Sequence, residues 1–315
     1  MNNLIKITFF VFLLSCGQDI TYENNIKKDL IFLADDKLEG RKTGTEGEKL
    51  AAKYISERFE KLNLSDKGTE NYYQDFYFGN NNNPHEEIEF KKESDNSQIH
   101  ARNVVGFLDN GGSNTVVIGA HYDHLGYGEE SSLYFGDEVL IHNGADDNAS
   151  GTSLLLDLAN RLATKELKSN YLFIAFSGEE MGLLGSNYFL KNPTVSKDEI
   201  NYMINMDMVG RLNEDNKLSV SGVGSAKIFK QIVNSNNSNF NLVEFGSSST
   251  SSFGSSDHAS FYYEDIPVLS FFTGQHEDYH KPSDDYDKIN FEGIELISDY
   301  IEDIIEELDS MDKLE

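Results

Sequence analysis

The stretch TVVIGAHYDH, residues 115–124, decides the fold class of this chain. Its run of β-branched residues predicts a buried strand, and His121 and Asp123 stand where that strand ends. The same order, an apolar run followed closely by acidic or imidazole groups, returns in NYLFIAFSGEE (170–180), NYMINMD (201–207) and PVLSFFTGQHEDYH (267–280). Open α/β sheets place ligands at the carboxyl ends of their strands. The repeated pattern therefore predicts a binding site at one edge of a sheet.

Segments with helical spacing lie between the predicted strands. The clearest are residues 150–163 and a C-terminal stripe formed by Ile294, Ile297, Ile301, Ile304, Ile305 and Leu308. Alternating strands and helices predict an α/β fold, a three-layer sandwich with a central mixed, mostly parallel sheet flanked by helices. The β-branched runs 103–107 and 115–121 are separated only by DNGGSN, which predicts a β-hairpin.

The composition excludes several classes of protein. The chain has 315 residues, with 26 Lys and Arg against 54 Asp and Glu, which gives a formal net charge of −28. So negative a chain repels phosphate backbones and anionic lipid headgroups, and we expect no nucleic-acid partner. The single Cys excludes a disulfide framework and a cysteine-based zinc site. Any bound metal must therefore be held by His and carboxylate side chains.

Residues 1–16 resemble a bacterial lipoprotein signal. Lys6 precedes a mainly apolar run, 7–14, that is too short to span a bilayer but is typical of a signal peptide. Cys16 follows LLS directly and would become the lipidated N-terminus of an exported protein, in the periplasm or at the outer membrane. An ordinary secretory leader with a chance Cys is the alternative. Residues 17–315 would then form a single domain.

The residue types at the predicted strand ends indicate a metal. Acids directly after NYLFIAF and NYMINM would be costly to hold near a buried sheet without a compensating cation. Two His with several carboxylates and no thiolate suit zinc, and suit manganese or cobalt less well. The candidate ligands are His121, Asp146, Glu180, Asp207 and His280. Five ligands are too many for one tetrahedral ion with an open position, so two ions that share a carboxylate fit better.

Several sequence blocks, taken in their order and spacing, resemble one family. They are LADDKLEGRKTGTEGEKLAAKYI (33–55), VVIGAHYDHLG (116–126), NGADDNASGT (143–152), AFSGEEMGLLGS (175–186), NMDMVGR (205–211), SSDHASF (255–261) and HEDYHKPSDD (276–285). The chain resembles the co-catalytic zinc aminopeptidases of clan MH, whose relatives include glutamate carboxypeptidases and glutaminyl cyclases. The resemblance implies a zinc exopeptidase-like fold without a protease-associated insert, and two Zn²⁺ ions per chain.

The resemblance also implies the part played by each ligand. His121 and Asp207 would be the terminal ligands of one zinc ion, and Glu180 and His280 those of the other. Asp146 would be the carboxylate that bridges the two ions.

The implied reaction is the removal of N-terminal residues from peptides by a hydroxide that the two metals share. Glu179 would be the general base, and Asp123 would orient the ring of His121. Some members carry a Tyr before the SDH block, where the nearest aromatic residue of this chain is Phe253. The expected substrate-binding residues are Phe253, Asp257, Arg211 and Tyr279.

Two other functions stay open, a glutaminyl-cyclase-like acyltransferase that uses one zinc ion and a metal-free binding module of the same fold. A carboxypeptidase would need a cation for the substrate carboxylate, and Arg211 is the obvious candidate. Loops around Met181, Gly210 and 253–261 offer several aromatic residues, which favours apolar or broadly varied N-terminal residues. We expect peptide substrates, membrane contact only through the N-terminal lipid, and a monomer.

Overall fold

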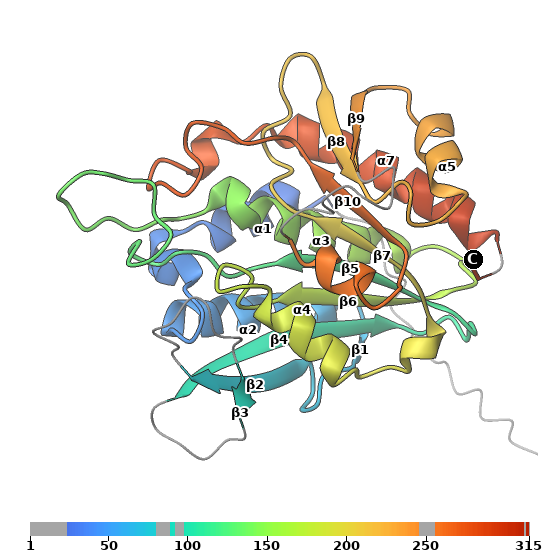
Figure 1. Ribbon diagram of the computed structural model, residues 1–315, viewed down its shortest axis with the longest axis horizontal. Helices are drawn as coiled ribbons and strands as arrows, with labels where there is room; N and C mark the ends of the chain where they lie inside the picture. Colours follow the sequence, from blue (N-terminus) through green and yellow to red (C-terminus); the bar gives the residue numbers. More distant parts are fainter. Residues whose placement is uncertain (1–23, 80–88, 92–97, 246–255, 312, 315) are drawn as a thin grey trace, which may run out of the picture.

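A ten-stranded mixed sheet forms the centre of the computed structural model, which describes residues 24–79, 89–91, 98–245, 256–311 and 313–314 (Figure 1). The strand order is β3-β2-β4-β6-β5-β7-β10-β8-β9, and β1 pairs with β4. The bounds are β1 Ser65–Asp66, β2 Tyr73–Gly79, β3 Phe90–Lys91, β4 Gln98–Leu108, β5 Thr115–His121, β6 Asn170–Phe176, β7 Ile200–Met206, β8 Lys217–Ser221, β9 Asn241–Phe245 and β10 Val268–Phe272. The lipoprotein signal expected at residues 1–16 lies outside the described residues.

Parallel pairing holds the middle of the sheet together. Strands β6, β5, β7 and β10 are parallel neighbours in that order, whereas β4 and β8 flank them in antiparallel pairs. The prediction of an α/β fold with a mixed central sheet is confirmed. The predicted hairpin is wrong, because β4 pairs with β6, where Val104 lies opposite Ala175, and β5 lies on the other side of β6. Strand β5 pairs on both sides with parallel strands, β6 and β7, and every residue of β5 is buried. Both of its edges are therefore occupied, and β4 cannot pair with it.

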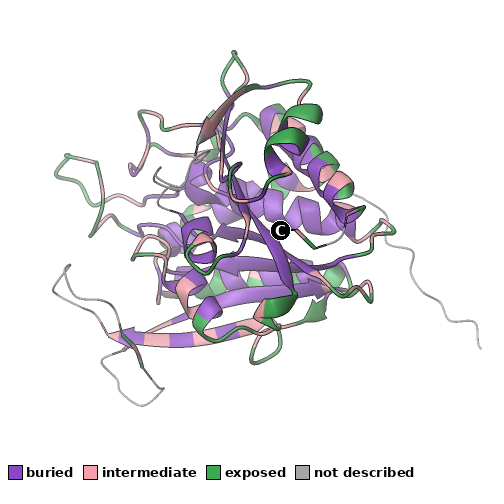
Figure 2. Cartoon of the chain, turned by 45° about the vertical axis from the view of Figure 1, so that its right-hand side comes forward, coloured by how far each residue is buried: buried purple, intermediate pink, exposed green. Residues whose placement is uncertain are grey.

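Helices cover both faces of the sheet, which gives the three layers (Figure 2). Their bounds are α1 Ile26–Leu33, α2 Glu46–Lys61, α3 Gly151–Leu162, α4 Leu184–Lys191, α5 Phe229–Ser235, α6 His258–Tyr262 and α7 Phe291–Asp309. Helices α1, α2, α3, α5 and α7 share one hydrophobic core with one face of the sheet, and α4 and α6 share a second core with the other face. Successive strand residues point to opposite faces, so Val116 and Ile118 enter the first core and Val117 enters the second.

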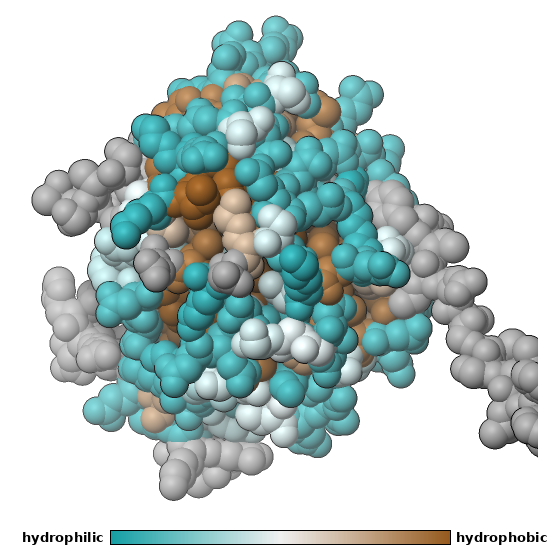
Figure 3. Space-filling model, turned by 90° about the vertical axis from the view of Figure 1, so that its right-hand side faces the viewer, coloured by the Kyte–Doolittle hydropathy of each residue, from teal (hydrophilic) through white to brown (hydrophobic). Residues whose placement is uncertain are grey.

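The predicted C-terminal stripe is the buried face of α7. Its members Ile294, Ile297, Ile301, Ile304 and Ile305 have no exposed surface, and the side chain of Asn290 caps the helix by accepting from the Gly293 N–H. The face of the molecule in Figure 3 is mainly hydrophilic, as the acidic composition predicts. Within the described part of the chain, each helix is too short or too polar to cross a bilayer.

Candidate metal centre

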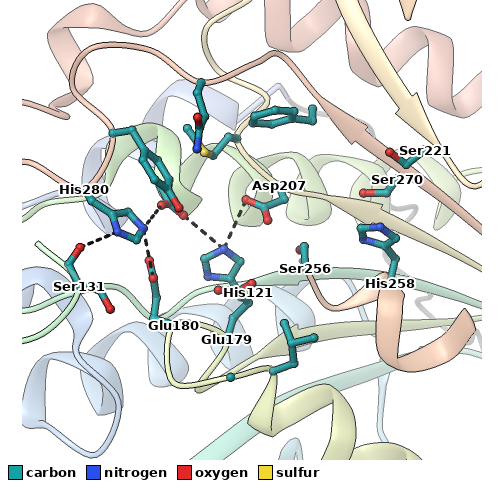
Figure 4. Close-up of a pocket in the computed structure, with 17 residues that line it drawn as sticks. His121, Ser131, Glu179, Glu180, Asp207, Ser221, Ser256, His258, Ser270 and His280 are labelled. Carbon is teal, nitrogen blue, oxygen red and sulfur yellow. Dashed lines mark hydrogen bonds and ion pairs between the residues drawn. The ribbon is translucent and has the colours of Figure 1, made fainter. Parts of the chain in front are cut away.

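The predicted ligands meet at the carboxyl ends of the parallel strands. His121 is the last residue of β5, Asp207 directly follows β7, and Glu180 lies in the turn after β6. His280 comes from the segment after β10 (Figure 4). The rule that parallel strands bring their carboxyl ends to one edge therefore predicted this meeting correctly.

Asp147 is the carboxylate that lies between the two groups of ligands. Its Oδ1 is 3.4 Å from His121 Nε2, which is also 3.4 Å from Asp207 Oδ1. Its Oδ2 is 3.2 Å from His280 Nε2, which lies 3.3 Å from Glu180 Oε2. One carboxylate thus presents one oxygen to each group, as a bridging ligand must. The peptide bond between Asp147 and Asn148 is cis.

The prediction that Asp146 takes the bridging position is wrong. Asp146 Oδ1 accepts from the Gly210 N–H and from the Ser150 hydroxyl, and Oδ2 lies 3.1 Å from His276 Nε2. These contacts use both oxygens of a side chain that has no exposed surface. Asp146 therefore ties the turn Ala145–Ser150 to the loop after β7 and stays outside both ligand groups.

His280 and His121 are held as metal-binding imidazoles are held. His280 Nδ1 donates to the Ser131 carbonyl at 2.8 Å, and His121 Nδ1 lies 3.3 Å from the Asp123 carbonyl. In both residues this leaves Nε2 directed into the site, which is the arrangement that fixes the tautomer of a metal ligand.

His124, which lies in the block VVIGAHYDHLG and was not predicted to be a ligand, is a further imidazole at the site. Its Nδ1 lies 2.8 Å from Glu180 Oε1, and it forms a possible ligand group with Asp147 and Glu180. Its Nε2 is buried and has no hydrogen-bond partner among the described residues. His124 thus holds Glu180 from the side opposite His280. Its place directly after the HYD triplet was the available signal.

The donor set fits zinc. Two buried or half-buried imidazoles and three carboxylates offer nitrogen and oxygen atoms, and the residues that the structure describes include no cysteine. Without a metal, the negative charges of the three carboxylates can be compensated at the site by protons, for example on the imidazoles. Although burial opposes it, contact with Asp147 and Glu180 raises the pKa of His280 to about 10. A cation bound between the same groups would provide that compensation instead.

Glu179 lies beside the ligands and also lines the pocket. Burial raises the pKa of its carboxyl group well above the ordinary value, and the neighbouring charges of Asp207 and Glu180 add to the effect. The Glu179 N–H donates to Asp123 Oδ1 at 3.2 Å. The same Asp123 oxygen lies 3.7 Å from His121 Nδ1, so Asp123 connects the predicted base with a ligand ring.

Residues 41–48, which lead into the first turn of α2, support the site from behind, and we call them the supporting segment. Arg41, almost wholly buried, donates to four backbone carbonyls, those of Leu33, Tyr122, Asn143 and Gly144. Burial lowers the pKa of Arg41 to about 10, although the nearby carboxylates oppose this shift. The guanidinium therefore remains a cation and joins the loop after β5 to the loop that carries Asp147.

Two more side chains of the supporting segment reach the site loops. Thr43 Oγ1 donates to Asp123 Oδ2 at 2.9 Å. Glu48 Oε1 accepts from the hydroxyls of Ser177 and Tyr122, and Oε2 accepts from the Gly44 N–H. Thr43 and Glu48 lie in the block 33–55 that resembles the family, but no part in the site was predicted for them.

Arg211 does not take the substrate-binding position that the sequence predicted. Its Nη2 donates to Asp278 at 2.9 Å and to Asp284 at 3.3 Å, and it does not line the pocket. Asp284 in turn accepts from the backbone N–H groups of Asp146 and Asp147. Arg211 is therefore part of the framework that holds the bridging turn, and its charge is already paired.

A pocket of about 800 Å³ opens beside the ligands. It is lined by Glu179, Tyr279 and all five residues of the two ligand groups, and by side chains from β8, β10 and the segment 256–258 (Figure 4). Tyr279, one of the predicted substrate-binding residues, is thus part of the pocket lining. Asp257 is fully buried and is absent from the lining, and burial raises its pKa to about 7. Phe253 lies outside the described residues.

Comparison with known proteins agrees with this architecture. Residues 103–305 match the family model described as Peptidase family M28. Aminopeptidase YwaD of Bacillus subtilis is 32% identical over 175 residues, which cover 52% of this chain and 38% of that protein. The chain covers less than half the length of the first curated relatives that it matches.

Two solved structures share the fold at low sequence identity. A Zn-dependent exopeptidase from Parabacteroides distasonis superposes with a TM-score of 0.71 at 19% identity and covers 91% of this chain and 99% of its own. A glutaminyl cyclase from Bacteroides thetaiotaomicron superposes with a TM-score of 0.68 at 16% identity, with 90% and 99% covered.

Proposed function

The chain belongs to peptidase family M28, and from that premise we propose that it is a zinc aminopeptidase that removes N-terminal residues from peptides. The observation that carries the proposal is the position of Asp147 between two groups of His and carboxylate ligands, with Glu179 beside them. The relatives named as aminopeptidases and zinc exopeptidases support the same activity.

The charge of the pocket favours an aminopeptidase over a carboxypeptidase. Its described lining contains the carboxylates of Asp147, Glu179, Glu180 and Asp207 and lacks Lys and Arg. Two bound zinc ions would offset these carboxylates, so the discriminating feature is the missing Lys or Arg, which a C-terminal carboxylate would need as its partner. Arg211, the cation that could have held a carboxylate, is paired with Asp278 and Asp284.

Two groups of residues would each hold one metal ion. We propose that His121, Asp207 and Asp147 hold one zinc ion, and that Asp147, Glu180 and His280 hold the second. Two ions held by these residues would lower the pKa of a bound water and would polarise the substrate carbonyl.

Glu179 then takes the proton of the attacking water on a carboxylate oxygen and delivers it to the nitrogen of the leaving amine. Burial raises the pKa of this carboxyl group in the metal-free protein, and cations bound to the neighbouring ligands would act in the opposite direction. Asp123 fixes the backbone of Glu179 and faces the His121 ring, so the base and the ligand keep one relative position.

Purified protein is tested on aminoacyl p-nitroanilides and on the same compounds blocked at the amine. We expect hydrolysis only with a free amine, loss of activity with a chelator, and recovery with zinc. Glu179→Gln should be nearly inactive while it retains zinc, and Glu166→Gln, an exposed carboxylate before the amino end of β6, is the matched control. Full activity of Glu179→Gln, or activity on blocked compounds, would contradict the proposal.

A glutaminyl cyclase is the second candidate, because a solved cyclase shares the fold. A peptide with N-terminal Gln separates the two activities by product mass, since cyclisation releases ammonia and hydrolysis releases free Gln. A binding module without metal would show neither product and would not respond to zinc.

We also propose that the protein is exported and anchored through a lipid on Cys16. The support is the sequence of residues 1–16 alone. Cys16→Ala should move the protein out of the membrane fraction, and an unchanged distribution would contradict the anchor.

A further inference from the structure

The wall of the pocket that faces away from the metal ligands consists of hydroxyl groups and an imidazole. Ser221 of β8 and Ser270 of β10 are a directly opposed cross-strand pair, and Ser256 and His258 lie next to them in the close-up (Figure 4). The sequence favoured apolar or broadly varied N-terminal residues, bound by loops around Met181, Gly210 and residues 253–261. Of the described residues, Gly182, Leu183 and Met208 from the first two loops and Ser256 and His258 from the third line the pocket.

Three of these hydroxyls are available to a ligand. Ser221 and Ser270 make no side-chain hydrogen bond with any residue that the structure describes. Ser256 Oγ accepts from Asn205 Nδ2 at 3.0 Å, which leaves its own O–H to donate. Asn205 has no exposed surface, so this amide fixes Ser256 from inside the sheet.

The hydroxyl wall is the enclosed part of the pocket. Ser256, His258 and Ser270 are 6%, 3% and 5% exposed and Ser221 is half-buried, whereas Ser131 and Gly182 of the same lining are exposed. An aminopeptidase substrate has one residue on the amine side of the scissile bond and a long chain on the other. The side chain of that first residue can enter an enclosed space, but the rest of the peptide must leave through the open mouth.

We propose that this wall selects an uncharged polar side chain, the amide of Asn or Gln, at the N-terminal position of the substrate. The inference rests on the proposed aminopeptidase function. Hydroxyls both donate and accept, as an amide does, whereas an apolar side chain would leave them without partners. Phe272 and Met208 also line the pocket and would contact the methylene groups of the side chain.

Charged side chains fit this wall less well. A substrate carboxylate against this wall would find no Lys or Arg in the described lining. A substrate ammonium group deep in the enclosed part would meet hydroxyls and no accessible carboxylate, because Asp257 does not line the pocket. Burial of an unpaired charge is costly in both cases.

The test compares near-isosteric pairs of aminoacyl p-nitroanilides, Asn with Leu and Gln with Met, by kcat/KM on the zinc-loaded protein. We expect the amide to be favoured in each pair by about tenfold or more. Ser221→Ala and Ser270→Ala should each reduce that preference by about five- to tenfold. Ser219→Ala is the matched control, because Ser219 lies on β8 but does not line the pocket, and it should preserve the preference.

Each outcome decides one of the two proposals. Faster hydrolysis of Leu and Met would overturn the amide preference and leave the aminopeptidase function standing. An unchanged preference in both Ser variants, with folding verified by circular dichroism, would also overturn it. No hydrolysis of any of the four compounds in the presence of zinc would overturn the aminopeptidase function and the amide preference with it.

Discussion

Asp146 and Asp147 are neighbours with opposite surroundings. Asp147 offers one oxygen to each ligand group, whereas both oxygens of Asp146 are used by Gly210, Ser150 and His276. We expect Asp147→Asn to lose zinc and to lower kcat/KM by more than about 100-fold, because even residues that only orient ligands are worth 10- to 100-fold.

Asp146→Asn is the matched substitution one residue away. It should retain two zinc ions per chain and lower mainly the free energy of unfolding. Metal analysis of both variants, together with kcat/KM, measures the difference. Zinc loss in Asp146→Asn with zinc retained in Asp147→Asn would show that the bridge has been misassigned.

The two Asp residues also mark the limit of prediction from sequence. Strand ends and residue types were sufficient to predict His121, Glu180, Asp207 and His280, because a strand that ends at the sheet edge fixes where the next side chain lies. The choice between two adjacent acids depends instead on the backbone of the turn Ala145–Ser150, in which Asp147 leaves helical geometry. Periodicity carries no signal for such a turn.

Glu48 makes stability depend on pH. Burial raises its pKa from 4.5 to about 7. Between these values the folded protein holds a proton on Glu48 that the unfolded chain has lost, so stability falls as pH rises through that interval and is constant above it. The lost stability is about 3 kcal/mol, at about 1.4 kcal/mol for each pKa unit.

Urea unfolding at pH 5 and pH 8 tests this effect in the wild type and in Glu48→Gln. Wild type should lose about 3 kcal/mol of unfolding free energy between pH 5 and pH 8 that Glu48→Gln retains. Other buried acids titrate equally in both proteins and cancel. Glu46→Gln, exposed on the same helix, should show no such movement, and identical behaviour of Glu48→Gln and wild type would contradict the prediction.

At the scale of elements, the supporting segment carries two threonine hydroxyls that make different contacts. Thr43 donates to Asp123, which positions Glu179 and faces His121, whereas Thr45 caps α2 by accepting from the Glu48 N–H. We expect Thr43→Val to lower kcat about tenfold with little change in KM, because the base and a ligand ring lose their fixed position.

Thr45→Val should instead cost about 1 kcal/mol of stability and leave kcat unchanged, since it removes only a helix cap. Steady-state kinetics and thermal unfolding of the two variants separate catalysis from folding. Equal kinetic effects of both substitutions would mean that the segment acts only through stability.

The elements also explain which parts of the fold could be predicted. The apolar stripe of α7 and the buried run of β5 are local patterns, and both formed as predicted. The hairpin failed because strand pairing is not local, and β6, more than 50 residues further along the chain, supplies the partner of β4. Arg41 escaped notice for the same reason, since three of its four acceptors lie 81 to 103 residues away.

For the whole molecule, the net charge of −28 matters most at the metal centre. Asp147, Glu179, Glu180 and Asp207 line one pocket, and Asp123 and Asp257 are buried close behind it. Arg41 is a buried cation behind the site, and its guanidinium is already engaged by four carbonyls. The folded state without zinc therefore bears repulsion between buried carboxylates, which two divalent cations would relieve.

Zinc removal should consequently lower the thermal stability of the entire domain. The ligands follow β5, β6, β7 and β10, so the metals would join the loops of four strands. Binding to the folded state alone is worth about 4 kcal/mol at 1,000 times Kd, which corresponds to roughly 10 °C in Tm for a chain of this size. Calorimetry with EDTA, with zinc-saturated EDTA as the control, measures the shift, and Asp147→Asn should not respond. An unchanged Tm after complete zinc removal, verified by metal analysis, would show that the carboxylates are compensated by protons and that the metals do not stabilise the fold.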